Sequence, residues 1–187
     1  MKYFTPERYL RLQNPDDSSA WLAAHNEWDE AVRAYWAEVR ALLERLPKKR
    51  WADGIRQFVK QGSLHDGTVT SCWYEGSQKL KLQVQPELPG ERLVLLEYTL
   101  AQEPTVLRNQ LPGEYIGEGR VEWMYDELGP VPGTQGGEFG FLHAILLSNG
   151  WELTIPFTRL RISRCQSILP AGQPESARLG RSLLQPA

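Results

Sequence analysis

The spacing of hydrophobic residues divides the chain into two parts. Between residues 21 and 46, apolar and aromatic side chains recur at alternating intervals of four and three, which is typical of an amphipathic helix. Pro47 is expected to end this helix, because proline lacks the backbone N–H and clashes with the preceding turn. Shorter helices are predicted over residues 6–13 and 51–59, although Gly54 disfavours the second by about 1 kcal/mol. The first third of the chain is therefore expected to be helical.

Beyond residue 62 the pattern changes to the alternation that is typical of β-strands. Strands are predicted over residues 68–74, 78–85, 93–100, 105–107, 120–128, 141–147, 151–157 and 158–163. In the strand 120–128, the alternation directs Val121, Trp123 and Tyr125 inward and Asp126 outward. Residues 141–147 are apolar on both faces, which predicts a strand in the interior of the sheet.

The dipeptide Asn149-Gly150 separates two apolar runs and favours a two-residue type I′ turn. Such a turn would pair Ala144 with Ile155. It would also place His143 on the opposite face, which it would share with Glu152, Thr154 and Pro156. Because proline cannot donate to a neighbouring strand, Pro156 indicates that the second strand lies near the rim of the sheet.

These elements predict an α+β fold, in which N-terminal helices, one of them long, pack on a mainly antiparallel sheet of six to eight strands that is strongly curled. We expect a single domain over residues 1–164, with a helical part over 1–61 and a β part over 62–164. The composition of residues 165–187 is rich in Gln, Ser, Pro and Gly, which predicts a mobile C-terminal tail.

Composition narrows the functional classes. The chain has 187 residues, 41% of them hydrophobic, and a net charge of −2, so it lacks the basic excess of a nucleic-acid-binding protein. No apolar run is long enough to span a membrane, and the first residues lack the apolar core of a signal peptide. The two cysteines, Cys72 and Cys165, are too few for a disulfide framework, although a single bond between them is an alternative. We expect a cytoplasmic protein.

Sequence motifs of phosphate binding, dinucleotide binding, serine hydrolysis and zinc proteolysis are absent. The remaining candidates for chemistry are His65, Asp66 and His143. An imidazole and a carboxylate can ligate zinc or iron, and a carboxylate beside an imidazole favours proton transfer. The alternative interpretation is structural, with His65-Asp66 in a turn and His143, like His25, hydrogen-bonded in the core.

Tyr125-Asp126-Glu127 ends a strand. If that strand is regular, the two carboxylates point to opposite faces and do not form an acid–base pair. We interpret them as solvated charges at the rim of the sheet.

Several segments resemble a bacterial family catalogued as domain of unknown function 4085. They are residues 1–5 (Met-Lys-Tyr-Phe-Thr), 64–66 (Leu-His-Asp), 123–127 (Trp-Met-Tyr-Asp-Glu) and 143–153 (His-Ala-Ile-Leu-Leu-Ser-Asn-Gly-Trp-Glu-Leu). The resemblance covers about residues 1 to 163 and implies a bacterial, cytoplasmic protein, with no activity, cofactor or partner attached. His65, Asp66 and His143 fall within the resembling segments, whereas His25 does not.

Three functional hypotheses follow. The first is a non-catalytic binding or interaction protein, with another protein as its partner and neither nucleic acid nor membrane. The second is a metal-dependent or acid–base enzyme that uses His65, Asp66 and His143. The third is a small-molecule pocket between the long helix and a curled sheet. The sequence identifies no cofactor and no oligomeric state.

Overall fold

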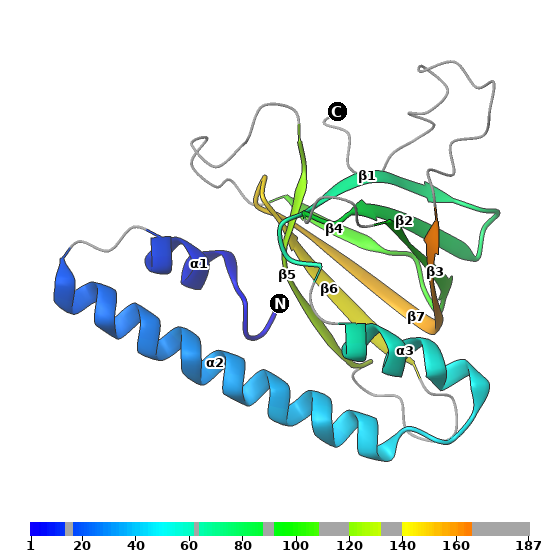
Figure 1. Cartoon of the computed structure of the whole chain (residues 1–187), viewed down its shortest axis with the longest axis horizontal. Helices are drawn as coiled ribbons and strands as arrows, with labels where there is room; N and C mark the ends of the chain where they lie inside the picture. The colour runs from blue at the N-terminus through cyan, green and yellow to red at the C-terminus, as the bar shows by residue number, and fades with distance from the viewer. Residues whose placement is uncertain (14–16, 62–63, 88–91, 109–119, 132–139, 166–187) are drawn as a thin grey trace.

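A computed structural model describes residues 1–13, 17–61, 64–87, 92–108, 120–131 and 140–165 (Figure 1). The fold is α+β, as the sequence predicts. The helices are α1 (Pro6–Gln13), α2 (Ser18–Arg45) and α3 (Arg50–Gln61), and the strands are β1 (Gly67–Tyr74), β2 (Lys79–Gln85), β3 (Leu93–Leu100), β4 (Thr105–Arg108), β5 (Glu122–Pro130), β6 (Phe141–Leu147) and β7 (Trp151–Cys165). Among the described helices, none combines the length and the apolar character needed to cross a membrane.

The antiparallel sheet closes on itself. Its strand order is β3-β2-β1-β5-β6-β7-β4, and β3 also pairs with β7, so that the first strand in the order meets the sixth. The pairing of β1 with β5 is short and covers only Gly67 with Trp123 and Thr68 with Glu122. The two strands overlap only at their first residues and run on in opposite directions, so β5 beyond Trp123 has no strand beside it on this edge among the described residues. α2 and α3 lie near this part of β5 (Figure 1).

β7 is one continuous strand where the sequence predicts two. It pairs with β6 along one edge and with both β4 and β3 along the other, so the prediction that it lies near the rim is wrong. On the second edge, the pairing with β4 ends at Thr154 and the pairing with β3 begins at Phe157. Pro156 lies in the interval between them, where a missing N–H breaks no hydrogen bond of the sheet.

The turn between β6 and β7 differs from the predicted type I′ turn. Ala144 pairs with Thr154 rather than with Ile155, which leaves a three-residue loop. Of the two turn residues, only Gly150 has a positive φ, 75°, whereas a type I′ turn needs positive φ at both central positions. The one-residue change in register places His143 opposite Ile155, on the core face of the hairpin.

β5 contains a bulge at Met124. Trp123 pairs with Leu147 and Tyr125 pairs with Leu146, so Met124 is an extra residue in the strand. A bulge interrupts the alternation of side chains. The prediction that Tyr125 points inward and Asp126 outward is therefore wrong: Tyr125 packs against Trp28 of α2 and Phe4 of the N-terminal segment, and Asp126 approaches the core.

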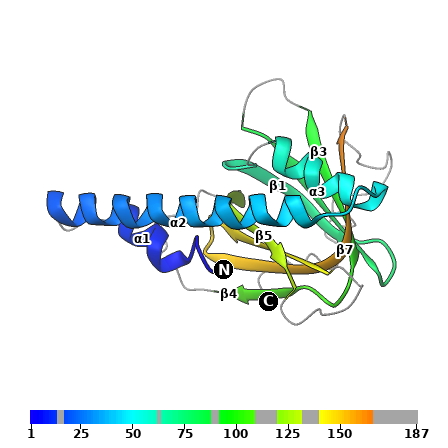
Figure 2. The same cartoon turned by 90° about the horizontal axis from the view of Figure 1, so that it is seen from below.

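α2 and α3 have different roles. α2 starts after the N-cap Asp17, whose carboxylate accepts hydrogen bonds from the backbone N–H groups of Ser19 and Ala20 at 2.8 Å. Only its C-terminal half lies against the sheet, and its first turns project beyond it (Figure 2). α3 packs against β7 and contributes Ile55 and Phe58 to the main core, together with strand residues such as Ile145.

Some predictions concern residues that the structure does not describe. The predicted tail lies outside the described residues except for Cys165, which ends β7. β5 ends at Pro130, two residues beyond the end of the predicted strand 120–128. The Cys72 thiol is buried and free, so it forms no disulfide bond. Burial raises its pKa to about 12, and the thiol therefore stays protonated at neutral pH.

Candidate functional site

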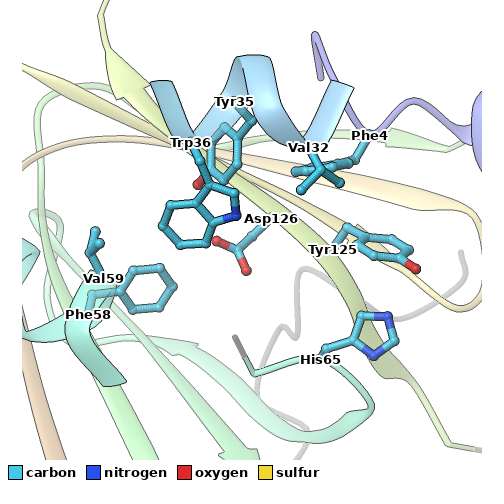
Figure 3. Close-up of a pocket in the computed structure, with 9 residues that line it drawn as sticks. All are labelled: Phe4, Val32, Tyr35, Trp36, Phe58, Val59, His65, Tyr125 and Asp126. Carbon is cyan, nitrogen blue, oxygen red and sulfur yellow. The ribbon is translucent and has the colours of Figure 1, made fainter. Parts of the chain in front are cut away.

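A cavity of about 290 Å³ lies beside β5, where α2 and α3 approach that strand (Figure 3). Four parts of the chain form its wall: the N-terminal segment, α2, α3 with the segment that follows it, and β5. The lining residues are Phe4, Val32, Tyr35, Trp36, Phe58, Val59, His65, Tyr125 and Asp126. The wall is thus mainly aromatic, with a single carboxylate among the described residues.

The aromatic rings of the wall pack on one another. The Phe4 ring is stacked on Tyr125 at 5.4 Å and meets Tyr35 edge-on at 5.2 Å, both measured between ring centroids. Phe4 is held in place because the Glu127 carboxylate accepts hydrogen bonds from the backbone N–H groups of Lys2, Tyr3 and Phe4 at 2.5 to 2.7 Å. Glu127, which we interpreted as a solvated rim residue, instead anchors the N-terminal segment against β5.

Asp126 lies at the base of the cavity and belongs to a buried hydrogen-bond network. Its Oδ1 accepts a hydrogen bond from Trp123 Nε1 at 3.0 Å, and its Oδ2 is 3.2 Å from His143 Nε2. His143 Nδ1 is 2.8 Å from the Tyr98 hydroxyl. The Asp126 side chain is only 9% exposed and that of His143 is fully buried, so Asp126 is the member of the network that lines the cavity.

Each hydrogen bond of the network can be assigned a donor and an acceptor without conflict. Burial raises the pKa of Tyr98 well above its ordinary value, and the negative charge of Asp126 raises it further, so the phenol keeps its proton. The Tyr98 hydroxyl can then donate to His143 Nδ1, which leaves the His143 proton on Nε2, where it is donated to Asp126. In this arrangement both ring nitrogens of His143 have a hydrogen-bond partner.

The structure does not bring the three predicted site residues together. His65 and Asp66 contact each other, with Nδ1 and Oδ2 at 2.6 Å, and Asp66 adopts a positive φ of 63° in the turn before β1. His65 reaches the cavity wall, where its ring meets Tyr125 edge-on at 4.6 Å. His143 bonds to Asp126 instead, and the Phe58 ring lies edge-on against it at 4.8 Å.

The described residues contain no group of three or more His, Cys, Asp or Glu side chains that could hold a metal ion. His25 is also away from any site. Its ring lies against Trp21 at 3.9 Å on the projecting end of α2, so the expectation that it is a core residue is wrong.

Sequence reasoning missed Asp126 as a site residue. In a regular strand, Asp126 would lie on the face opposite Trp123, and the bulge at Met124 brings both to the same side. No residue type at that point signals the bulge, because Met124 fits a regular strand equally well. The wall residues on α2 were visible only as part of the hydrophobic stripe, which is typical of a packing surface rather than of a cavity.

The electrostatics of the wall are simple. Of the described residues that line the cavity, none is Lys or Arg. Burial raises the pKa of Tyr35, and the charges of Asp126 and Glu127 raise it further. Burial also raises the pKa of Tyr125 to about 12. Both phenols are therefore neutral at physiological pH, and the negative charge of the wall is concentrated on Asp126.

Fold and site together define an α+β protein with a small aromatic cavity beside a closed antiparallel sheet. Neither models of protein families nor curated protein sequences give a match to this chain.

Proposed function

We propose that this chain is a non-catalytic binding protein whose cavity holds a small molecule. One observation carries the proposal: aromatic side chains from four separate parts of the chain surround a cavity whose described wall contains one carboxylate, that of Asp126. Small-molecule sites have this character, because apolar walls supply the binding energy and a few polar groups fix the orientation. A cavity of about 290 Å³ is at the small end of such sites.

The test is a variant that fills the cavity. Val32 lines the wall from α2, and Val32→Trp should occupy the space without removing a polar group. A screen of small aromatic amines, alcohols and acids by thermal shift, followed by calorimetry, should find compounds that bind the unaltered chain. We expect their affinity to fall at least tenfold in Val32→Trp.

Leu22→Trp is the matched control, because Leu22 is exposed on the same helix and away from the cavity. It should bind as the unaltered chain does. Equal affinity in the Val32→Trp variant and in this control would show that the compounds bind elsewhere and would contradict the proposal.

The enzymatic alternative, based on His65, Asp66 and His143, has weaker support. His143 is fully buried and covered by Phe58, so it cannot touch a substrate in the cavity. His65 and Asp66 form a pair of their own at the edge of the cavity. One observation supports this alternative. Asp126 links the cavity to His143 and Tyr98 through hydrogen bonds, and a proton could move along them.

A protein partner is a second candidate, and the projecting end of α2 supports it. Trp21 and Leu22 are 47% and 55% exposed there, beyond the sheet (Figure 2). Exposed large apolar side chains are typical anchors of protein interfaces. Cross-linking in native lysate should place a partner at this end of α2, and Trp21→Ser with Leu22→Ser should abolish the cross-links.

The control for this experiment is Asp29→Ser with Arg33→Ser, since both residues are exposed on the same helix. It should retain the cross-links. Cross-links that persist in the Trp21→Ser and Leu22→Ser variant would argue against this interface.

The cytoplasmic setting and the relationship to domain of unknown function 4085 stay predictions from the sequence. The free, buried Cys72 thiol supports the first, because reduced cysteines are usual in the cytoplasm. Nucleic acid remains an unfavoured partner on the grounds of net charge.

A further inference from the structure

We propose that the ligand of the cavity is a small organic cation, namely a protonated amine that carries a compact apolar group. This inference rests on the proposed function, and it names the chemical class of the ligand. It follows from the charge, the hydrogen bonding and the ring surfaces of the wall.

The first argument is the charge of Asp126. Its carboxylate is almost completely buried, and its hydrogen-bond partners are the neutral indole of Trp123 and the imidazole of His143. Among the described residues of the wall, none is Lys or Arg. A buried carboxylate is costly unless it is paired, and a bound ammonium group would place a full positive charge against the side of Asp126 that lines the cavity.

The second argument is the acceptor capacity of Asp126. A carboxylate can accept about four hydrogen bonds, two at each oxygen. Trp123 donates to Oδ1 and His143 to Oδ2, so each oxygen keeps acceptor capacity for a donor in the cavity. An ammonium group has only donors and fits this need, whereas a ligand carboxylate would place two negative charges side by side.

The third argument is the set of ring surfaces around Asp126. Tyr35 and Trp36 lie on the α2 side of the carboxylate, and Phe58 lies on the α3 side (Figure 3). Aromatic faces attract cations through the ring quadrupole and also pack against alkyl or aryl groups. A protonated amine with an apolar group uses both properties of this wall, and the size of the cavity limits that group to a compact one.

The test compares three probes of similar size by calorimetry on the unaltered chain. Phenethylamine is a cation at neutral pH, phenethyl alcohol is its neutral counterpart, and hydrocinnamate is an anion. We expect phenethylamine to bind at least tenfold more tightly than the alcohol and hydrocinnamate to show no binding. In Asp126→Asn, the affinity for the amine should fall to that for the alcohol.

The matched control is Asp29→Asn, which makes the same chemical change at an exposed position of α2 and should leave all affinities unchanged. If Asp126→Asn does not fold, the affinities of the unaltered chain for the three probes are enough to test whether the ligand is a cation. Binding of the alcohol as tightly as the amine, or a preference for hydrocinnamate, would contradict the proposal that the ligand is a cation. Either result would still support the proposal that the cavity binds a small molecule. Binding of none of the three would contradict the proposed function itself.

Discussion

Replacing Gly54 by alanine should destabilise the protein by about 2 kcal/mol, although alanine is the better helix former. A Cβ atom at this position of α3 would lie 1.7 Å from the Leu160 carbonyl oxygen of β7. That atom belongs to the backbone of a paired strand, so the helix or the strand must move. Overpacking of this kind typically costs 1–3 kcal/mol or more, which outweighs the gain of about 1 kcal/mol in helix propensity.

Urea unfolding followed by circular dichroism measures this effect. Gly129→Ala is the matched control, because Gly129 has nothing within 4 Å of an added Cβ and does not have a positive φ. We expect the control to stay within about 0.5 kcal/mol of the unaltered chain. If Gly54→Ala were as stable as the unaltered chain, α3 could not lie as close to β7 as the structure places it.

Asp126→Leu should cost about 3 kcal/mol, because it removes the acceptor of two buried donors. The Trp123 Nε1–H and the His143 Nε2–H would both lose their partner. A buried donor without a partner costs roughly 1–3 kcal/mol. The free energy of unfolding, measured by denaturant titration, should therefore fall well below that of the exposed control Asp29→Leu, which we expect within about 0.5 kcal/mol of the unaltered chain.

A double-mutant cycle separates the network from a general effect of the substitution. His143→Phe removes one of the stranded donors, so the combination with Asp126→Leu should cost less than the sum of the two single changes. Additive costs would mean that Asp126 and His143 do not interact. Because Asp126 also lines the cavity, the same variants show whether the carboxylate that serves stability also serves binding.

The position of Asp126 on β5 explains both its role in the buried hydrogen-bond network and its role in lining the cavity. β1 and β5 pair at only two positions, at the start of each strand, so β5 beyond Trp123 has no strand beside it on this edge among the described residues. Aromatic side chains of α2, α3 and the N-terminal segment cover much of this part of β5 and leave a cavity above Asp126 (Figure 3). Since hydrogen bonds from Trp123 and His143 fix the Asp126 carboxylate, its position does not depend on a ligand.

Much of the fold follows from the sequence by itself. The four-and-three spacing from residue 21 to residue 46 identified α2, and the alternation beyond residue 62 identified the strands, because these periods reflect which side chains a helix or a strand can bury. The apolar run 141–147 was recognised as an interior strand, and β6 has β5 and β7 on its two sides. His65 and His143 were recognised from the sequence as candidate site residues, but their positions relative to each other were not.

Only the tertiary structure decided the site. A three-residue turn in place of the predicted two-residue turn set which β7 residues share a face with His143, and the bulge at Met124 brought Asp126 beside it. Gly54, which weakens a helix on propensity, is required by the close approach of α3 to β7. Periodicity records which faces are buried, whereas single-residue shifts in register and contacts between distant segments leave no local pattern in the chain.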